Sequence, residues 1–361
     1  MGSAAQFAAA LSLLARTVPA RTPVPVLGAC RLSVAGGTVE LAATDLEVSL
    51  RLRADGVTGE GAGAVLLPAR FLADLFRHLE GDFDLEAVEG GAVVRCGQAR
   101  FALNVLDPSS YPQIPAPQKE RSARVPFGFL RRVASRVGIA CSGDAARGAL
   151  AGVLWEEGPE GLTLVATDAT RLAYWRVAER VVEARGKIVV PGRALSLVAG
   201  LPDREEVDVV LEDTRVFFST LSWTLCSRLI AAPFPRWETV LPRQFVASFV
   251  VSRRECAAAL RRAAVVAHDG TPALRVVVDR GGVAVEASSP GNGGGRGREE
   301  LEAEVEGTGV TAAFDARLLL DGVEAFEGEK LRFSLAGAEA VSELSDPEDP
   351  GYRYLVLPLR Q

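Results

Sequence analysis

The sequence is poor in the residues on which most catalytic and metal sites depend. It contains only two histidines, one methionine and five cysteines among its 361 residues. The cysteines are scattered and form no CxxC pair, which predicts reduced, mostly buried thiols rather than a zinc site or a disulfide framework. No GxSxG, HExxH, Walker A or dinucleotide-binding motif is present, and Gly291–Gly297 lacks the Lys-Ser/Thr and the following helix of a phosphate-binding loop. We therefore expect no catalysis, no metal and no cofactor.

Long apolar runs and lysines are also scarce. No run approaches the roughly 20 apolar residues of a membrane span, and no basic segment precedes an apolar one at the N-terminus. We therefore expect a cytoplasmic protein with no membrane partner. The only lysines are Lys119, Lys187 and Lys330, so nearly all of the 40 basic residues are arginines. The formal net charge of −6 by itself argues against a general nucleic-acid binder.

The sequence contains an internal repeat. Thr44 and Thr167 stand in similar stretches, LAATDLEVSLRL and VATDATRLAYWRV, at an offset of 123 residues. Two further landmarks share this offset: Leu67-Pro68-Ala69-Arg70 with Val190-Pro191-Gly192-Arg193, and Tyr111-Pro112 with Phe234-Pro235. A third and looser copy places Phe314-Asp315-Ala316-Arg317 at an offset of 124 from the second. A repeat fixes the architecture, so we predict three domains, at 1–119, 120–244 and 245–361.

Each copy is predicted to be an α+β unit that contains two helices and several short strands. Apolar spacing and proline positions predict the following helices: Gln6–Val18, Ala69–Leu79, Phe127–Ile139, Pro191–Leu201, Arg253–Ala267 and Asp315–Phe326. Alternating or apolar runs predict a strand that begins at Pro25. They also predict strands over Cys30–Val34, Thr38–Ala43, Glu47–Arg53, Asp84–Val88, Ala92–Cys96, Arg100–Val105, Ala149–Glu156, Leu162–Thr167, Arg171–Val177, Glu206–Leu211, Val216–Thr220, Thr224–Leu229, Ala273–Val278, Val283–Ala287, Glu299–Val305, Lys330–Leu335, Ala340–Leu344 and Arg353–Leu359. Linkers are expected at Pro115–Arg124 and Pro242–Ala247.

Taken together, the repeat and its motifs resemble the bacterial DNA polymerase III beta subunit, the sliding clamp. The motifs that carry the resemblance are Arg21-x-Pro23-x-Pro25-Val26-Leu27, Ala43-Thr44-Asp45-Leu46-Glu47, Pro68-Ala69-Arg70, Val165-Ala166-Thr167-Asp168 with Arg171-Leu172-Ala173, Phe234-Pro235 with Val240-Leu241-Pro242, and the C-terminal Tyr354–Arg360. The resemblance covers essentially the whole chain. It implies a processivity factor in which a head-to-tail homodimer of six like domains forms a ring around duplex DNA. It also implies inward-facing helices, an outer wall of antiparallel sheets, and a subunit contact near Val265 and Val266.

A clamp that slides needs sparse cations that meet phosphates without reading bases. The helix-borne arginines fit this need, and Arg21 matches a family position that contacts DNA. The DNA-facing residues are therefore expected to be Arg21, Arg70, Arg77, Arg131, Arg132, Arg136, Arg193, Arg253, Arg254 and Arg317. The alternative is that each of these arginines simply lies on a solvated helix face.

The resemblance also implies a groove in which short linear motifs of DNA polymerase and clamp-loader subunits bind. By motif match the groove residues are Leu150, Thr167, Arg171, Leu172, Pro235, Val240, Leu355, Leu357, Pro358, Leu359 and Arg360. Leucine and valine would form an apolar trough, and Arg171 would orient a peptide. The alternative is that the leucines belong to the core of a C-terminal strand, an alternative that is more serious for Leu355 than for Leu357.

The sequence departs from the family pattern at this groove. Ala169 and Thr170 stand where Gly-His is common, Leu318 where an aromatic residue is expected, and Thr239 where a basic residue is frequent. These departures leave open whether the chain is the replicative clamp or a specialised or inhibitor-resistant paralogue. A third alternative is a monomeric three-domain binding module that never closes into a ring.

Overall fold

The computed structural model describes residues 1–118, 122–178, 186–202, 205–267, 273–289, 295–307 and 309–360. His268, one of the two histidines, therefore lies outside the described residues. So do Gly291–Gly294 of the glycine-rich segment and the predicted domain boundary at 119–120. The described chain separates into two compact units. Unit 1 comprises Met1–Arg131 and Arg193–Leu229, and unit 2 comprises Arg132–Gly192 and Ile230–Gln361.

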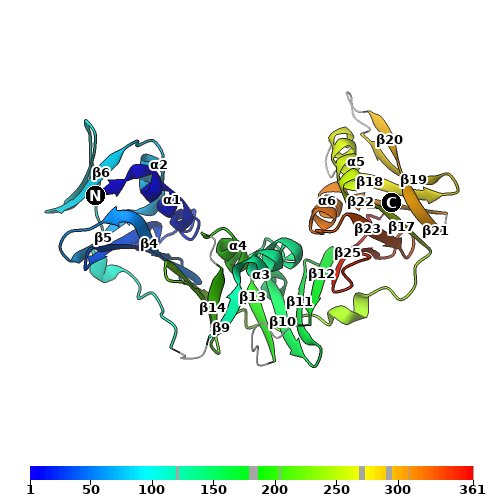
Figure 1. Cartoon of the computed structure of the whole chain (residues 1–361), viewed down its shortest axis with the longest axis horizontal. Coiled ribbons are helices and arrows are strands. Elements are labelled where there is room, and N and C mark those ends of the chain that lie inside the picture. The colour runs from blue at the N-terminus through cyan, green and yellow to red at the C-terminus, as the bar shows by residue number, and fades with distance from the viewer. Residues whose placement is uncertain are drawn as a thin grey trace. The chain divides into compact units, whose positions relative to one another are not determined.

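Unit 1 is built on one twelve-stranded sheet (Figure 1). Its strands are β1 (Gly2–Ser3), β2 (Ala29–Ala35), β3 (Thr38–Thr44), β4 (Val48–Thr58), β5 (Gly63–Pro68), β6 (Asp82–Val88), β7 (Gly91–Cys96), β8 (Ala99–Asn104), β9 (Ala123–Pro126), β14 (Glu206–Leu211), β15 (Arg215–Ser219) and β16 (Trp223–Arg228). The strand order is β8-β7-β6-β1-β4-β16-β15-β14-β9, with β2, β3 and β5 attached beside β4. The pairing of β4 with β16 joins the first sequence copy to the second.

The helices of unit 1 cover an aromatic core. Helices α1 (Ala4–Ala15) and α2 (Ala69–Phe76) pack against each other, and α4 (Gly192–Ala199) lies almost wholly in this unit. The rings of Phe7, Phe76 and Phe83 are buried with centroids 4.7 to 4.9 Å apart. Edge-to-face and stacked pairs of this kind stabilise a core beyond their buried area. The short 3-10 turns of the unit are Pro25–Gly28 and Pro108–Ser110.

Unit 2 contains two sheets. The nine-stranded sheet has the order β13-β10-β11-β12-β25-β24-β23-β17-β21, and the four-stranded sheet has the order β20-β19-β18-β22. The strands are β10 (Gly152–Gly158), β11 (Gly161–Thr167), β12 (Arg171–Val177), β13 (Lys187–Pro191), β17 (Ala247–Ser252), β18 (Ala273–Asp279), β19 (Gly282–Ser288), β20 (Arg296–Leu301), β21 (Ala303–Gly307), β22 (Val310–Asp315), β23 (Lys330–Leu335), β24 (Ser342–Ser345) and β25 (Tyr352–Val356). The pairing of β12 with β25 joins the second copy to the third.

The α-helices of unit 2 are α5 (Arg253–Val266) and α6 (Ala316–Glu324), which contact each other. Helix α3 (Phe127–Arg132) lies in unit 1 up to Arg131, and the π-helix and 3-10 turn that follow it lie in unit 2. Ser252 caps α5, and Asp315 caps α6 through its side chain. Gly322 lets α6 approach β25 closely, because a Cβ atom there would lie 2.4 Å from the ring of Tyr354. This close approach brings the outer residues of α6 next to β12 and β25.

The described helices and antiparallel sheets form an α+β fold, so the predicted fold class is confirmed, although several predicted elements differ in detail. The strand expected to begin at Pro25 is a 3-10 turn, and the strand expected from Ala149 starts only at Gly152, after a 3-10 segment. The helix expected over Phe127–Ile139 changes to a π-helix at Val133–Val137 and a 3-10 turn at Gly138–Ala140. The predicted final strand stops at Val356, which leaves Leu357–Arg360 outside the sheet.

Candidate functional site

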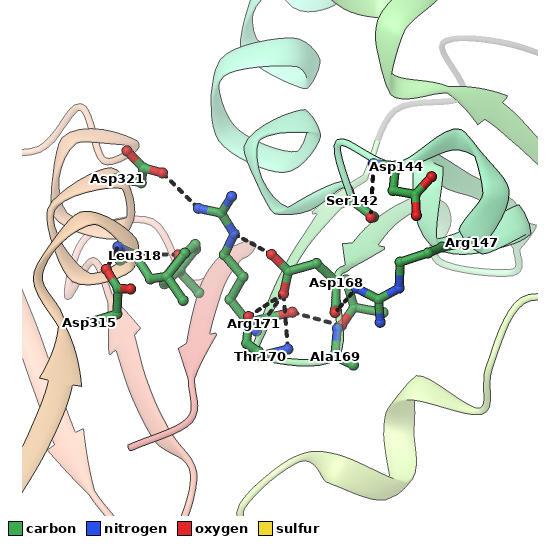
Figure 2. A network of polar contacts seen from close by, with 12 residues as sticks. Ser142, Asp144, Arg147, Asp168, Ala169, Thr170, Arg171, Asp315, Leu318 and Asp321 are labelled. Atoms are coloured by element: carbon green, nitrogen blue, oxygen red, sulfur yellow. Dashed lines mark hydrogen bonds and ion pairs between the residues drawn. The ribbon is translucent and has the colours of Figure 1, made fainter. Parts of the chain in front are cut away.

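The Thr-Asp motif of the second copy is a tight corner between β11 and β12. The Thr167 hydroxyl donates to the carbonyl of Arg171 at 2.6 Å and accepts the amide of Ala169. One carboxylate oxygen of Asp168 accepts the amides of Thr170 and Arg171 and the Thr170 hydroxyl (Figure 2). Asx and Thr side chains that replace backbone partners in this way are typical of turns. The corner forces Ala169 to a φ of 75°, in the left-handed region.

The first copy builds the same corner in unit 1. Thr44 donates to the carbonyl of Val48 and accepts the amide of Leu46, and Asp45 accepts the amides of Glu47 and Val48. Leu46 has a φ of 78°, and among the described residues only Leu46 and Ala169 combine a side chain with a positive φ. Their offset is again 123 residues. The two Thr-Asp motifs are therefore structural corners, and each Asp carboxylate accepts hydrogen bonds from the backbone.

Arg171 connects the second corner to helix α6. Its Nε donates to Asp168 at 2.9 Å, and a terminal nitrogen donates to Asp321 of α6 at 2.7 Å (Figure 2). Burial opposes the charge on Arg171, but Tyr354, Asp321 and Asp168 together raise its pKa, so the guanidinium stays charged. Burial likewise acts against ionisation of Asp168, yet hydrogen bonds from Thr170 and Arg171 lower its pKa. The arginine expected to orient a peptide is thus already bound by two carboxylates.

The C-terminal tail runs beside this corner. Arg171 pairs with Val356 in the β12–β25 ladder, and the next amide, that of Leu357, donates to the carbonyl of Thr170 at 2.9 Å. The amide of Leu359 donates to the carbonyl of Ala313 in β22 at 2.7 Å. The Leu357 side chain is 42% exposed. The tail is therefore held by its backbone while part of its apolar surface remains open to solvent.

An apolar cluster lies beneath the corner and the tail. Its buried members are Leu154, Val165, Leu172, Val189, Trp237 and Leu355, with Tyr174, Ile230, Phe234, Leu241 and Val341 packed against them. The rings of Tyr174 and Trp237 have centroids 5.1 Å apart. The Trp237 indole nitrogen is buried and has no hydrogen-bond partner among the described residues. The alternative reading of Leu355 as a core residue is correct, since it is only 1% exposed.

The predicted groove residues thus divide by burial. Thr167, Leu172 and Leu355 are buried and would support a groove from below. Val240, Pro235, Leu357 and Arg360 are exposed, and the intermediate residues are Leu150, Arg171, Pro358 and Leu359. The departures Ala169, Thr170 and Thr239 are exposed, whereas Leu318 is half-buried on α6. Sequence reasoning missed Asp321, because its partner Arg171 lies 150 residues away and no local pattern links them.

The arginines expected to face DNA do not all remain available. Arg136 is a correction: it is only 4% exposed, donates to Asp349 at 2.9 Å and stacks on the rings of Trp175 and Tyr352. A buried, paired guanidinium cannot meet a phosphate. Arg136 lies in the π-helix Val133–Val137 that replaces part of the predicted α-helix.

The other nine arginines fall into three groups, each described within its own unit. Arg193 pairs with Asp45 and donates to the carbonyl of Thr17, and Arg77 pairs with Asp74. Backbone carbonyls accept from Arg70, Arg131 and Arg253, and the guanidinium of Arg132 lies over the Trp175 ring. The remaining three, Arg21, Arg254 and Arg317, are exposed and form no ion pair with any described residue. Most of these cations therefore have a structural partner and keep part of their charge at the surface.

The predicted dimer residues lie at the end of α5, next to the edge strand β20. Val265 is 76% exposed. The side chain of Val266 lies against Gly295 and Gly297, and Arg262 pairs with Glu299 of β20. Among the strands of the described residues, β20 pairs only with β19, just as β8 in unit 1 pairs only with β7. An open strand edge offers unpaired backbone N–H and C=O groups to another strand.

Three models of the DNA polymerase III beta subunit match consecutive parts of the chain. The N-terminal domain model matches residues 3–115, the central one 124–236 and the C-terminal one 238–360. The chain belongs to the DNA polymerase III beta subunit family. The family resemblance that the sequence motifs indicated is therefore confirmed.

Individual members of this family align with this chain over nearly the whole length of both proteins. The beta sliding clamp of Streptomyces coelicolor is 29% identical, and the alignment covers 98% of this chain and 96% of the relative. The Bacillus subtilis beta sliding clamp is 26% identical, with 96% and 95% covered. A crystal structure of a Pseudomonas aeruginosa sliding clamp bound to griselimycin is 27% identical and superposes with a TM-score of 0.86, covering 99% of this chain and 98% of that one. Three tandem clamp domains thus account for the repeat.

Neither a membrane-spanning helix nor a cluster of metal ligands is found in the described part of the chain. No helix in this part is long and apolar enough to cross a membrane. No group of three or more His, Cys, Asp or Glu side chains in the described ranges could hold a metal ion.

Proposed function

We propose that the chain is a DNA sliding clamp that forms a homodimeric ring around duplex DNA and tethers DNA polymerase and clamp-loader subunits through a peptide groove. The observation that carries the ring is the repeated strand junction. In unit 1 the strand after the first corner, β4, pairs with the last strand of the second copy, β16. In unit 2 the strand after the second corner, β12, pairs with the last strand of the third copy, β25.

The third junction has no partner within one chain. The equivalent strands are β20 of the third copy and β8, the last strand of the first copy, and both end their sheets. A second chain supplies the missing partner: β20 of one subunit pairs with β8 of the other, and the reverse pairing closes the ring. Such a head-to-tail contact is heterologous, and it closes when the rotation between domains fits the number of domains. Closure also removes two open sheet edges.

Subunit association is tested by light scattering. The wild-type chain is expected at twice its mass of 38.2 kDa at micromolar concentration. Val265→Asp should shift it toward 38.2 kDa, because a carboxylate would be buried against the partner. Leu221→Asp is the matched control, since Leu221 is fully exposed in the β15–β16 turn and outside the proposed contact. A wild-type mass of one chain would favour the monomeric binding module.

Binding of DNA is proposed to be topological and sequence-independent. The cations available are Arg21, Arg70, Arg77, Arg131, Arg132, Arg193, Arg253, Arg254 and Arg317, without Arg136. Most already have protein partners, which suits weak phosphate contacts that permit sliding. The deciding experiment compares retention on circular and linear DNA after loading. A clamp is lost from linear ends and kept on circles, whereas equal retention on both would refute the proposal.

Partner recruitment is proposed to use the surface over the apolar cluster, with Val240, Pro235 and Leu357 as its exposed apolar contacts. Leu357→Asp should weaken the binding of a labelled partner peptide at least tenfold, since a hydrophobic contact becomes a buried charge. Leu221→Asp again serves as the control. Equal affinities of the wild type and Leu357→Asp would remove the tail from the groove.

The departures at Ala169, Thr170, Thr239 and Leu318 favour one second candidate, a specialised or inhibitor-resistant paralogue. A peptide optimised for a typical clamp should then bind this chain measurably worse. Griselimycin, which is bound in the Pseudomonas aeruginosa structure, offers a direct test by calorimetry. Affinity equal to that of the Pseudomonas protein would argue against resistance. In either case we assign the chain no catalytic step and place it in the cytoplasm.

A further inference from the structure

The ion-pair set at the second corner has an unusual charge balance. Two carboxylates, those of Asp168 and Asp321, hold the single guanidinium of Arg171. The side chains of Arg171 and Asp168 are 12% and 15% exposed, whereas that of Asp321 is 48% exposed. Asp168 also accepts three hydrogen bonds from the corner. The carboxylate of Asp321 is therefore the most exposed charge of the three, and Figure 2 shows the guanidinium of Arg171 between it and the carboxylate of Asp168.

The link between Arg171 and Asp321 is not needed to join two copies. By the repeat offsets, the first copy has Val48 at the position of Arg171, and helix α4 has Leu197 at the position of Asp321. Both are buried apolar residues, and the β4–β16 junction forms without this ion pair. The first junction instead links Arg193 of α4 to Asp45 of its corner. The second junction has thus exchanged which side supplies the cation.

We propose that Asp321 sets the charge preference of the partner groove, an inference that rests on the proposed function of this surface. A peptide that covers Leu357 passes Arg171, because the amide of Leu357 donates to the carbonyl of Thr170, the neighbour of Arg171 in the chain. An unpaired arginine there would attract a peptide carboxylate. With Asp321 bound, the same position repels a carboxylate and accepts hydrogen bonds. The partner peptides of this chain therefore carry an amide or a cationic side chain beside their apolar anchors, and not an Asp or Glu.

The test uses Asp321→Asn and a matched control on the same helix, Glu324→Gln. Glu324 pairs with Arg261 instead of Arg171, so both variants remove one negative charge from α6 while only the first changes the corner. The probes are fluorescein-labelled nonapeptides derived from a parent selected on the wild-type chain from a random library. A single guest position, moved along the peptide, carries Asp, Asn or Lys.

At the position that meets the corner, the wild type should bind the Asp peptide about fivefold more weakly than the Asn peptide, the upper range for one half-exposed charge pair. Asp321→Asn should bring this ratio to about one or invert it, and Glu324→Gln should leave it unchanged. A ratio of affinities within one protein is insensitive to a general loss of stability. An unchanged ratio in Asp321→Asn, with the parent peptide still bound, would overturn this inference alone. If no selected peptide binds Leu357→Asp more weakly than the wild type, the groove itself is refuted and this inference with it.

Discussion

Replacing Ala169 by glycine should stabilise the protein, although most alanine-to-glycine changes do the opposite. Ala169 has a φ of 75° and an exposed side chain. An L-residue in the left-handed region costs about 1–2 kcal/mol relative to glycine. Glycine in turn makes the unfolded chain more flexible, at a cost of about 0.4–1 kcal/mol. The difference predicts a gain of about 0.5–1 kcal/mol in the free energy of unfolding.

Nothing else in the corner should change with this substitution. The hydrogen bonds come from the side chains of Thr167 and Asp168 and from backbone groups, and the Ala169 methyl group takes part in none of them. A urea titration followed by tryptophan fluorescence is a suitable assay. Three of the four tryptophans, Trp155, Trp175 and Trp237, lie in the same unit as Ala169.

Ala145→Gly provides the matched control. Ala145 is exposed at the start of a 3-10 segment in the same unit, where alanine is not strained. Only the unfolded-state term then applies, and stability should fall by about 0.4–1 kcal/mol. The two substitutions remove the same methyl group and should differ in sign. A loss of stability in Ala169→Gly as large as that in Ala145→Gly would refute the left-handed corner.

Three further outcomes follow from the structure. Arg136→Ala should lower the free energy of unfolding by about 2–3 kcal/mol, because it removes packing on Trp175 and Tyr352 and leaves Asp349 unpaired. The exposed Arg132 is the control, and Arg132→Ala should lower the free energy of unfolding by less than about 0.5 kcal/mol. Urea titrations measure both variants. Burial raises the pKa of Cys30 and Cys256 to about 12, so these two thiols should react with Ellman's reagent at pH 8 only after denaturation, and rapid reaction of either in the native protein would contradict its burial. Because the folded-state pKa values of these thiols and of Cys141 exceed the 9.0 of a free thiol, the unfolded chain loses its thiol protons first. Stability should therefore fall as pH rises from about 9 toward 12, which thermal melts would record.

The repeat could be predicted from the sequence because turns and helix starts depend on local chemistry. The Thr-Asp corners and the Pro-x-Arg helix starts use side chains that bond to nearby backbone. Strands that run directly into a helix were missed in every copy. These include β5 before α2, β13 before α4 and β22 before α6. Each is a short apolar run with no turn residue between it and the helix, and such runs carry no periodicity that distinguishes strand from helix.

The candidate site was predictable only in part, because its decisive contacts join distant segments. Leu357 and Val240 could be matched by motif, and both are exposed. The burial of Arg136 depends on Asp349, 213 residues away, and on a π-helix that apolar spacing does not indicate. The predicted linker at Pro115–Arg124 also includes the start of β9, whose pairing with β14 again depends on distant residues.

The repeat itself allows a stricter test of the Arg171–Asp321 pair than removing either partner. Arg171→Val with Asp321→Leu would give the second junction the two apolar residues that the first copy and α4 have at the equivalent positions, Val48 and Leu197. Replacing an ion pair by apolar residues is often neutral, while removing one partner leaves the other charge without compensation. The double variant should therefore unfold within about 1 kcal/mol of the wild type, and Arg171→Val alone, which leaves Asp168 and Asp321 facing each other, should lose more. If the double variant loses as much as the sum of the two single variants, the coupling energy between the two positions is zero, and the assignment of Arg171 and Asp321 as an interacting pair would be refuted.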